Sequence, residues 1–133
     1  LELNPGNSDL DVQVGDFYYD ARQYAKAVAA YENVLKVDPV NVHAFNNLAW
    51  LLATCPDKTF RKDSRALALA WQAMELQKEA YVLDTYAEAL YLNNYKRQAL
   101  AAAKQALEIS TQKKQYYVDQ VARFEKALQN PLL

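Results

Sequence analysis

The chain has 133 residues, with 15 basic and 16 acidic side chains and a formal net charge of −1. This balance excludes a general electrostatic attraction to nucleic acid or to anionic membranes, so no nucleic-acid partner is expected. One cysteine and one histidine exclude an internal disulfide and a zinc site with four Cys and His ligands, and neither a metal nor a cofactor is expected. Two glycines, four prolines and few β-branched residues predict an all-α protein.

The N-terminal stretch repeats a pattern that recurs later in the chain. Residues 1–7 match the pattern of residues 35–41, and Pro39 follows Pro5 by 34 residues. A fixed spacing of this size is typical of helical repeat arrays. No helix precedes residues 1–7, so we interpret them as the remnant of an upstream repeat whose body is missing.

Two helices are predicted next. The first covers residues 8–21 and has Ser8 or Asp9 as its N-cap, because a short side-chain oxygen can accept a hydrogen bond from an unpaired N–H of the first turn. The second covers residues 24–37 and ends at an Asp38-Pro39 stop. A short turn joins them, so they should pack antiparallel. Their predicted apolar sides carry Val14, Phe17 and Tyr18 on the first helix and Ala27, Val28, Tyr31, Val34 and Leu35 on the second.

Two further helix pairs follow by the same periodicity. One pair covers residues 42–54 and 63–76, joined by a polar loop about five residues longer than the first turn, an insertion that costs little closure entropy. The other pair covers residues 79–92 and 95–109 with an Asn-Asn turn.

A last helix is predicted at residues 112–129. Its apolar side carries Tyr117, Val121, Phe124 and Leu128, and its polar positions include Gln120 and Arg123. We expect the apolar side to cover the preceding helix pair and the polar side to face water.

Small residues recur at three equivalent positions of the three units. Gly15, Ala49 and Ala87 occupy the first position, Ala27, Ala66 and Ala99 the second, and Val34, Ala73 and Ala106 the third. This pattern resembles the tetratricopeptide repeat family, in which small residues stand where helices approach closely. Asp11 and Val34 depart from the family pattern. The stretch LAWLLATCPD with its longer loop is similar to a subgroup found at the C-terminal end of bacterial repeat proteins.

The resemblance implies a right-handed α-α superhelix, or solenoid, of three helix pairs plus a C-terminal capping helix. The expected units are residues 1–7 as a repeat remnant, 8–41 as the first repeat, 42–79 as the second with its five-residue insertion, 80–111 as the third, and 112–133 as capping helix and tail.

In that family the first helices of the pairs line a concave groove. The resemblance therefore implies a peptide-binding groove made of Asp16, Tyr19, Asp20, His43, Asn46, Asn47, Trp50, Tyr81, Asp84, Glu88 and Tyr91, and the same register adds Asp9, Val12, Gln13, Thr54 and Thr85. Acidic, amide and aromatic side chains of this kind are typical of interaction surfaces. An acidic groove repels a carboxylate, so the expected partner is a protein or peptide segment that is neutral or basic.

The alternative expectation is a purely architectural part of a longer array that mediates assembly, or self-association through the exposed N-terminal repeat end. No constellation predicts an enzyme. His43 is interpreted as a polar groove residue rather than a base. Cys55 is interpreted as a partly buried apolar residue, although the nearby Lys58, Arg61 and Lys62 leave a reactive thiol open. With Arg65, these basic residues are interpreted as solvated loop charge rather than a phosphate site.

No apolar run approaches the roughly 20 residues that cross a bilayer, and no signal segment opens the chain. We expect no membrane insertion and a soluble fragment, cytoplasmic or periplasmic.

Overall fold

The computed structural model describes residues 7–129, and within them the chain forms α-helices and no β-strand. The helices are α1 (Ser8–Asp20), α2 (Tyr24–Val37), α3 (Val42–Thr54), α4 (Asp63–Leu76), α5 (Ala80–Leu92), α6 (Lys96–Ile109) and α7 (Lys114–Gln129), and a short 3-10 helix η1 (Lys58–Phe60) lies between α3 and α4. The predicted all-α class is confirmed for these residues. The expected repeat remnant lies outside the described residues apart from Asn7.

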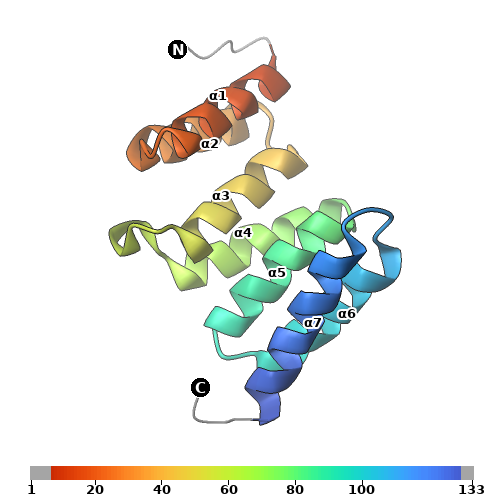
Figure 1. The fold of residues 1–133 in the computed structure, drawn as a ribbon. Helices are drawn as coiled ribbons and strands as arrows, with labels where there is room; N and C mark the ends of the chain where they lie inside the picture. The colour runs from red at the N-terminus through yellow and green to blue at the C-terminus, as the bar shows by residue number, and fades with distance from the viewer. Residues whose placement is uncertain (1–6, 130–133) are drawn as a thin grey trace.

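The seven helices pack in the order in which they occur along the chain (Figure 1). The most extensive contacts join α1 to α2, α3 to α4, and α5 to α6. Each of α2, α4 and α6 also packs against the next odd-numbered helix, while α1 contacts α3 and α3 contacts α5. The odd-numbered helices therefore form one layer, and the even-numbered helices form a second layer behind it.

Helix starts are fixed by asparagine side chains at two places. The Asn7 side chain accepts a hydrogen bond from the Leu10 N–H at 3.1 Å, and Asn41 does the same for Ala44 at 2.9 Å. Such caps satisfy N–H groups that have no partner within the helix. The prediction of Ser8 or Asp9 as the cap of α1 is wrong, because Asn7 is the extended residue before the helix and Ser8 already lies inside it.

The turns α1–α2 and α5–α6 have the same geometry. Arg22 and Asn94 adopt positive φ angles of 61° and 69°. In the first turn the N–H groups of Arg22 and Gln23 bond the carbonyls of Tyr19 and Tyr18, and the second turn repeats this pattern from Leu90 to Tyr95. This is the hydrogen-bond pattern of a Schellman C-cap, which stops one helix and reverses the chain within a few residues.

The small residues that suggested the family resemblance are all buried. Gly15 shows why one of them has no side chain. A Cβ on Gly15 would lie 2.5 Å from Cε1 of Tyr31, well inside van der Waals contact. The ring of Tyr31 therefore lies directly across α1 at Gly15, and this close approach sets the position of its hydroxyl group.

The predicted apolar side of α1 is wrong in part. Phe17 is 54% exposed, whereas Val12, assigned by register to the groove, is buried in the core. The helix turns Asp11, Val12 and Gly15 inward. Val12 is therefore a packing residue and not a binding residue.

Helix α7 packs against α6 through Tyr117, Val121 and Phe124, as predicted, with Ala127 buried in addition and Leu128 only partly buried. Among the described residues, no helix combines the length and the apolar character needed to cross a bilayer.

Candidate functional site

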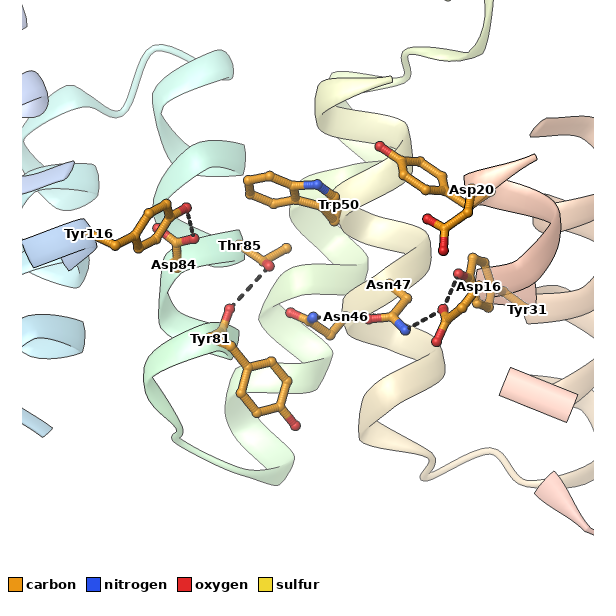
Figure 2. A pocket seen from close by; sticks show the side chains of 11 residues that line it. Asp16, Asp20, Tyr31, Asn46, Asn47, Trp50, Tyr81, Asp84, Thr85 and Tyr116 are labelled. Carbon is orange, nitrogen blue, oxygen red and sulfur yellow. Dashed lines mark hydrogen bonds between the residues drawn. The ribbon is translucent and has the colours of Figure 1, made fainter. Parts of the chain in front are cut away.

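A cavity of about 430 Å³ opens on the layer of odd-numbered helices (Figure 2). Its lining comes from α1, α3, α5 and α7, with one residue from α2: Asp16, Tyr19, Asp20, Tyr31, Asn46, Asn47, Trp50, Tyr81, Asp84, Thr85 and Tyr116. Eight of the eleven predicted groove residues are among them, and Thr85 comes from the same register. His43, Glu88 and Tyr91 are not part of this lining.

One end of the cavity is organised around Asp16 on α1. Its Oδ1 atom accepts a hydrogen bond from the Tyr31 hydroxyl at 2.5 Å and another from Asn47 Nδ2 at 2.9 Å. Burial, and then the hydrogen bond to Asp16, raise the pKa of Tyr31 far above its usual value. Tyr31 was predicted only as a core residue. Its ring is indeed buried, but its hydroxyl reaches the cavity because Gly15 leaves room for the ring.

The hydrogen bonding continues from Asp16 into α3 with a fixed direction. A carboxylate only accepts, so Asn47 must turn its Nδ2 group towards Asp16. Asn47 Oδ1 is then available and accepts from Asn46 Nδ2 at 3.2 Å. This leaves Asn46 Oδ1, which is shielded from solvent and accepts no hydrogen bond from the described residues. Asn46 is 6% exposed, and its oxygen points away from Asn47 towards α5 (Figure 2).

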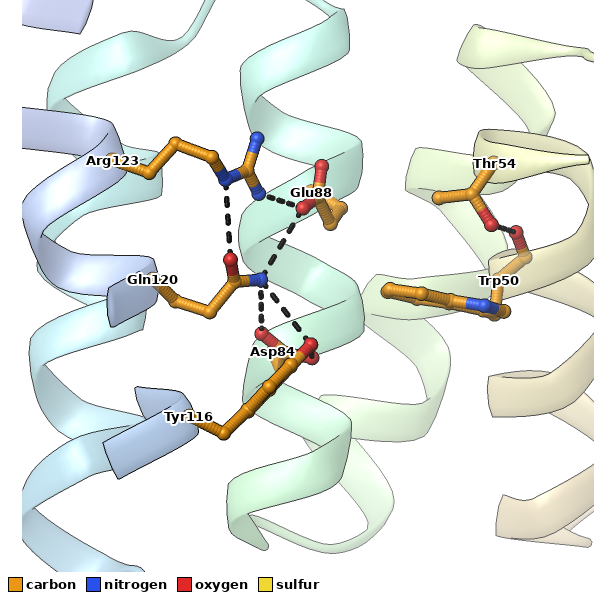
Figure 3. Close-up of polar contacts among 7 residues, drawn as sticks. All are labelled: Trp50, Thr54, Asp84, Glu88, Tyr116, Gln120 and Arg123. Carbon is orange, nitrogen blue, oxygen red and sulfur yellow. Dashed lines mark hydrogen bonds and ion pairs between the residues drawn. The ribbon is translucent and has the colours of Figure 1, made fainter. Parts of the chain in front are cut away.

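The other end of the cavity is organised around Asp84 on α5, which helix α7 already engages (Figure 3). The Tyr116 hydroxyl donates to Asp84 Oδ2 at 2.6 Å, and Gln120 Nε2 donates to Asp84 Oδ1 at 3.1 Å. Burial and the bond to Asp84 raise the pKa of Tyr116 well above its usual value. The buried Asp84 carboxylate is therefore satisfied from within the protein.

Glu88, one turn further along α5, is also held by α7. It forms an ion pair with Arg123 and accepts a hydrogen bond from Gln120 at 3.4 Å (Figure 3). Arg123 Nε in turn donates to Gln120 Oε1 at 3.1 Å. Gln120 and Arg123 were predicted to face water. Gln120 is partly buried against the acidic residues of α5, and Arg123 stays 45% exposed while it pairs with Glu88.

The remaining predicted residues lie beside the cavity. His43 stacks on Tyr81 with ring centroids 5.8 Å apart, and its Nδ1 atom lies 3.4 Å from the Tyr81 hydroxyl oxygen. Tyr91 packs on Phe124 of α7 with ring centroids 5.4 Å apart. His43 thus supports a lining residue, and Tyr91 belongs to the contact between α5 and α7.

The loop after α3 holds no exposed thiol. Cys55 is fully buried, more so than predicted, and burial raises the pKa of its thiol, which disfavours the thiolate. The Arg61 side chain donates to the Cys55 backbone oxygen at 2.7 Å, and Arg65 pairs with Glu32 of α2 at 3.1 Å. Among the described residues, no three His, Cys, Asp or Glu side chains come together as a metal site.

Sequence reasoning missed Tyr116, Gln120 and Arg123 as partners of the acidic residues. A signal was present, because Asp84 and Glu88 are four residues apart and the three α7 residues follow at steps of four and three. Both sets therefore form a stripe on one helix face. One stripe is built of acceptors and the other of donors, so the two are complementary.

Comparisons with known proteins add no further guide to this site. No protein-family model matches the chain, and no curated protein matches it. The cavity offers its own chemistry as the guide: carboxylates and amides, most of them in fixed hydrogen bonds, and five aromatic side chains, Tyr19, Tyr31, Trp50, Tyr81 and Tyr116.

Proposed function

We propose that the protein is an interaction scaffold that binds a neutral or basic segment of a protein or peptide in this cavity. The observation that carries the proposal is the composition of the lining, which holds Asp16, Asp20 and Asp84 and, among the described residues, no Lys, Arg or His. Such a lining attracts positive charge and repels an acidic tail. The partly exposed rings of Tyr19 and Trp50 supply apolar contact area that loses little entropy on binding.

The proposed architecture is a right-handed superhelix of three tetratricopeptide-type pairs closed by α7 as the capping helix. Three observations support it: the two-layer packing of odd and even helices, the burial of the residues at all nine equivalent repeat positions, and the matching turns at Arg22 and Asn94. In such a scaffold the first helices of the pairs present the binding surface.

The two ends of the cavity are unequal as binding sites for a cation. Asp84 already accepts hydrogen bonds from α7. Asp20 is exposed and forms no hydrogen bond or ion pair with the described residues. A basic side chain of the partner is therefore expected at the end formed by α1 and α3.

The test is a calorimetric titration with three peptides of equal length, one basic, one neutral and one acidic, that are identical at all other positions. The chain has two tryptophans, and Trp71 lies exposed on α4, outside this cavity. In a Trp71→Phe variant, the fluorescence of Trp50 alone reports binding. Binding of the basic peptide with a change in this fluorescence is expected. The proposal fails if the acidic peptide binds best, or if Trp50→Ala binds the basic peptide as well as Trp71→Ala does.

A second candidate function is self-association through α1. Leu10 is 46% exposed and Phe17 is 54% exposed, and with Val14 they follow each other at four- and three-residue steps on one helix face. Apolar side chains gathered in this way are typical of contact surfaces. Light scattering on wild type and Phe17→Ser, with the exposed Val40→Ser as control, tests this. A monomer at all concentrations excludes self-association.

A further inference from the structure

Most hydrogen-bond donors that line the cavity are used within the protein, and among the described residues the Trp50 indole N–H and the Tyr19 hydroxyl are exceptions. The hydroxyl groups of Tyr31 and Tyr116 donate to carboxylates, and that of Thr85 donates to the backbone oxygen of Tyr81 at 3.2 Å. The amide groups of Asn46 and Asn47 donate to their neighbours in the direction set by Asp16. A ligand therefore finds few donors here.

Two acceptors are in the opposite state. Asn46 Oδ1 is buried and accepts no hydrogen bond from the described residues, and the Asp20 carboxylate is exposed and equally unengaged. An unsatisfied buried acceptor destabilises the free protein, and a ligand that donates to it recovers that free energy. The side chains around Asn46 cover its oxygen, so a donor reaches it by displacing them. The cavity thus selects a ligand that brings hydrogen-bond donors.

The arrangement of α1 and α3 further restricts the kind of ligand that fits this end of the cavity. Asp16 and Asp20 lie one turn apart on α1, and Asn46 and Trp50 lie one turn apart on α3, so each pair shares a helix face. The bond from Asn47 to Asp16 holds the two helices together at this point. Figure 2 shows the Trp50 ring extending from α3 towards Thr85 of α5, so it lies between the acidic residues of α1 and Asp84. A group entering here meets the carboxylates of Asp16 and Asp20, and the indole ring of Trp50 lines the same cavity.

We infer that this end of the cavity receives the guanidinium group of an arginine side chain from the bound segment, with Asn46 Oδ1 accepting a further N–H from the same segment. This inference rests on the proposed function. A guanidinium has five N–H donors in a planar fork, keeps its charge at any physiological pH, and stacks on aromatic rings. A lysine ammonium has three donors and no plane to stack, so it fits less well.

The probes for this test are N-acetyl-arginine methylamide and its lysine and citrulline analogues, titrated at millimolar concentration. Citrulline retains the shape and most donors of arginine but carries no charge. Binding is followed by NMR through the side-chain N–H signals of Trp50 and of the asparagine amides, with the Trp71 indole as an internal control. The arginine probe should shift the Trp50 signal and leave that of Trp71 in place. The lysine probe should bind about 3-fold or more weaker, and the citrulline probe about 10-fold or more weaker.

Two variants locate the contacts. Asp20→Asn should weaken binding of the arginine probe by about 3- to 10-fold, whereas Asp9→Asn, the same charge change on α1 outside the cavity, should leave it unchanged. Asn46→Leu removes the unpaired acceptor. An arginine-containing peptide should then bind about 10-fold weaker while the melting temperature stays equal or rises. A purely structural asparagine would give the opposite result, a lower melting temperature with unchanged binding.

The failures of the inference and of the proposed function are distinguishable. Equal binding of the arginine and citrulline probes, or of arginine and lysine, overturns the guanidinium assignment even where the basic peptide binds at Trp50. Binding of the arginine probe with no binding by any peptide overturns the scaffold function and leaves a small cation site. Absence of any shift at Trp50 overturns the arginine site.

Discussion

Substitution of Gly15 by alanine tests whether the Tyr31 ring can approach α1 only because Gly15 has no side chain. Glycine inside a helix is about 1 kcal/mol less favourable than alanine, so propensity alone predicts that Gly15→Ala stabilises the protein. The structure predicts the reverse. The new Cβ would lie 2.5 Å and 2.8 Å from Cε1 and Cδ1 of Tyr31, and the ring must retreat by about 1 Å to reach normal carbon–carbon contact.

The expected cost has two parts. Overpacking in a tight core typically costs about 1–3 kcal/mol. Retreat of the ring also stretches the bond from the Tyr31 hydroxyl to Asp16, and a hydrogen bond to a charged group contributes about 1.5–3 kcal/mol. After the propensity gain is subtracted, Gly15→Ala should lower the free energy of unfolding by about 2–4 kcal/mol, measured by urea denaturation.

A double-mutant cycle separates these contributions. In a Tyr31→Leu background the ring and hydroxyl are gone, so Gly15→Ala should stabilise the protein by up to about 1 kcal/mol through propensity alone. The sign of the alanine effect therefore depends on residue 31. If alanine stabilises both backgrounds equally, the contact does not constrain α1 and this reasoning is wrong.

Three further predictions concern single contacts. Arg123→Gln should lower the free energy of unfolding by about 1–2 kcal/mol, because it leaves the largely buried Glu88 without its ion-pair partner. Lys126→Gln on the same helix should change it by less than about 0.5 kcal/mol, with both values measured by urea denaturation. Because the pKa of Tyr31 is raised in the folded state, the unfolded state loses the hydroxyl proton first as the pH rises above about 10. The free energy of unfolding should therefore fall by about 1.4 kcal/mol per pH unit through this group. Tyr31→Phe should show a correspondingly shallower loss of stability at alkaline pH, followed by circular dichroism. Arg22→Gly should raise stability by about 0.5–1 kcal/mol, seen as a higher melting temperature, because glycine adopts the positive φ of this turn without a steric cost; a decrease would show that the arginine side chain stabilises the turn.

Helix positions were predictable because their signals are local. Apolar residues at three- and four-residue steps and breaks such as Asp38-Pro39 placed every helix within a few residues of its observed ends. The buried small residues were predictable for a related reason. Close helix packing excludes large side chains whatever the surrounding sequence, so Ala27, Ala66 and Ala99 carry the information themselves.

Features that depend on the relative positions of helices were not predictable. A stripe of Tyr116, Gln120 and Arg123 is compatible both with water and with an acidic helix opposite. Only the packing of α7 beside α5 brings it to Asp84 and decides between the two. The orientation of α1 about its own axis was ambiguous in the same way, because the sequence allows either Val12 or Phe17 to face the core.

Within the cavity, the residue types were predictable and their hydrogen-bonding states were not. The sequence places Asn46 and Asn47 side by side, but neither residue type reveals which amide nitrogen points where. That direction comes from Asp16, which is 31 positions away from Asn47 along the chain. The unpaired oxygen of Asn46 is a property of the folded network and has no counterpart in the sequence pattern.

The packing of the helices in chain order also affects how the molecule folds and how it opens locally. Most contacts join helices that are adjacent or nearly adjacent in the chain, so little of the fold depends on closing long loops. Folding is therefore expected to be fast and able to begin at more than one helix pair, with hydrogen exchange graded from protected central helices to faster outer ones. The same arrangement bears on the width of the cavity. Its two walls carry Asp16 and Asp84, and we expect small tilts between α3 and α5 to change the distance between these two carboxylates.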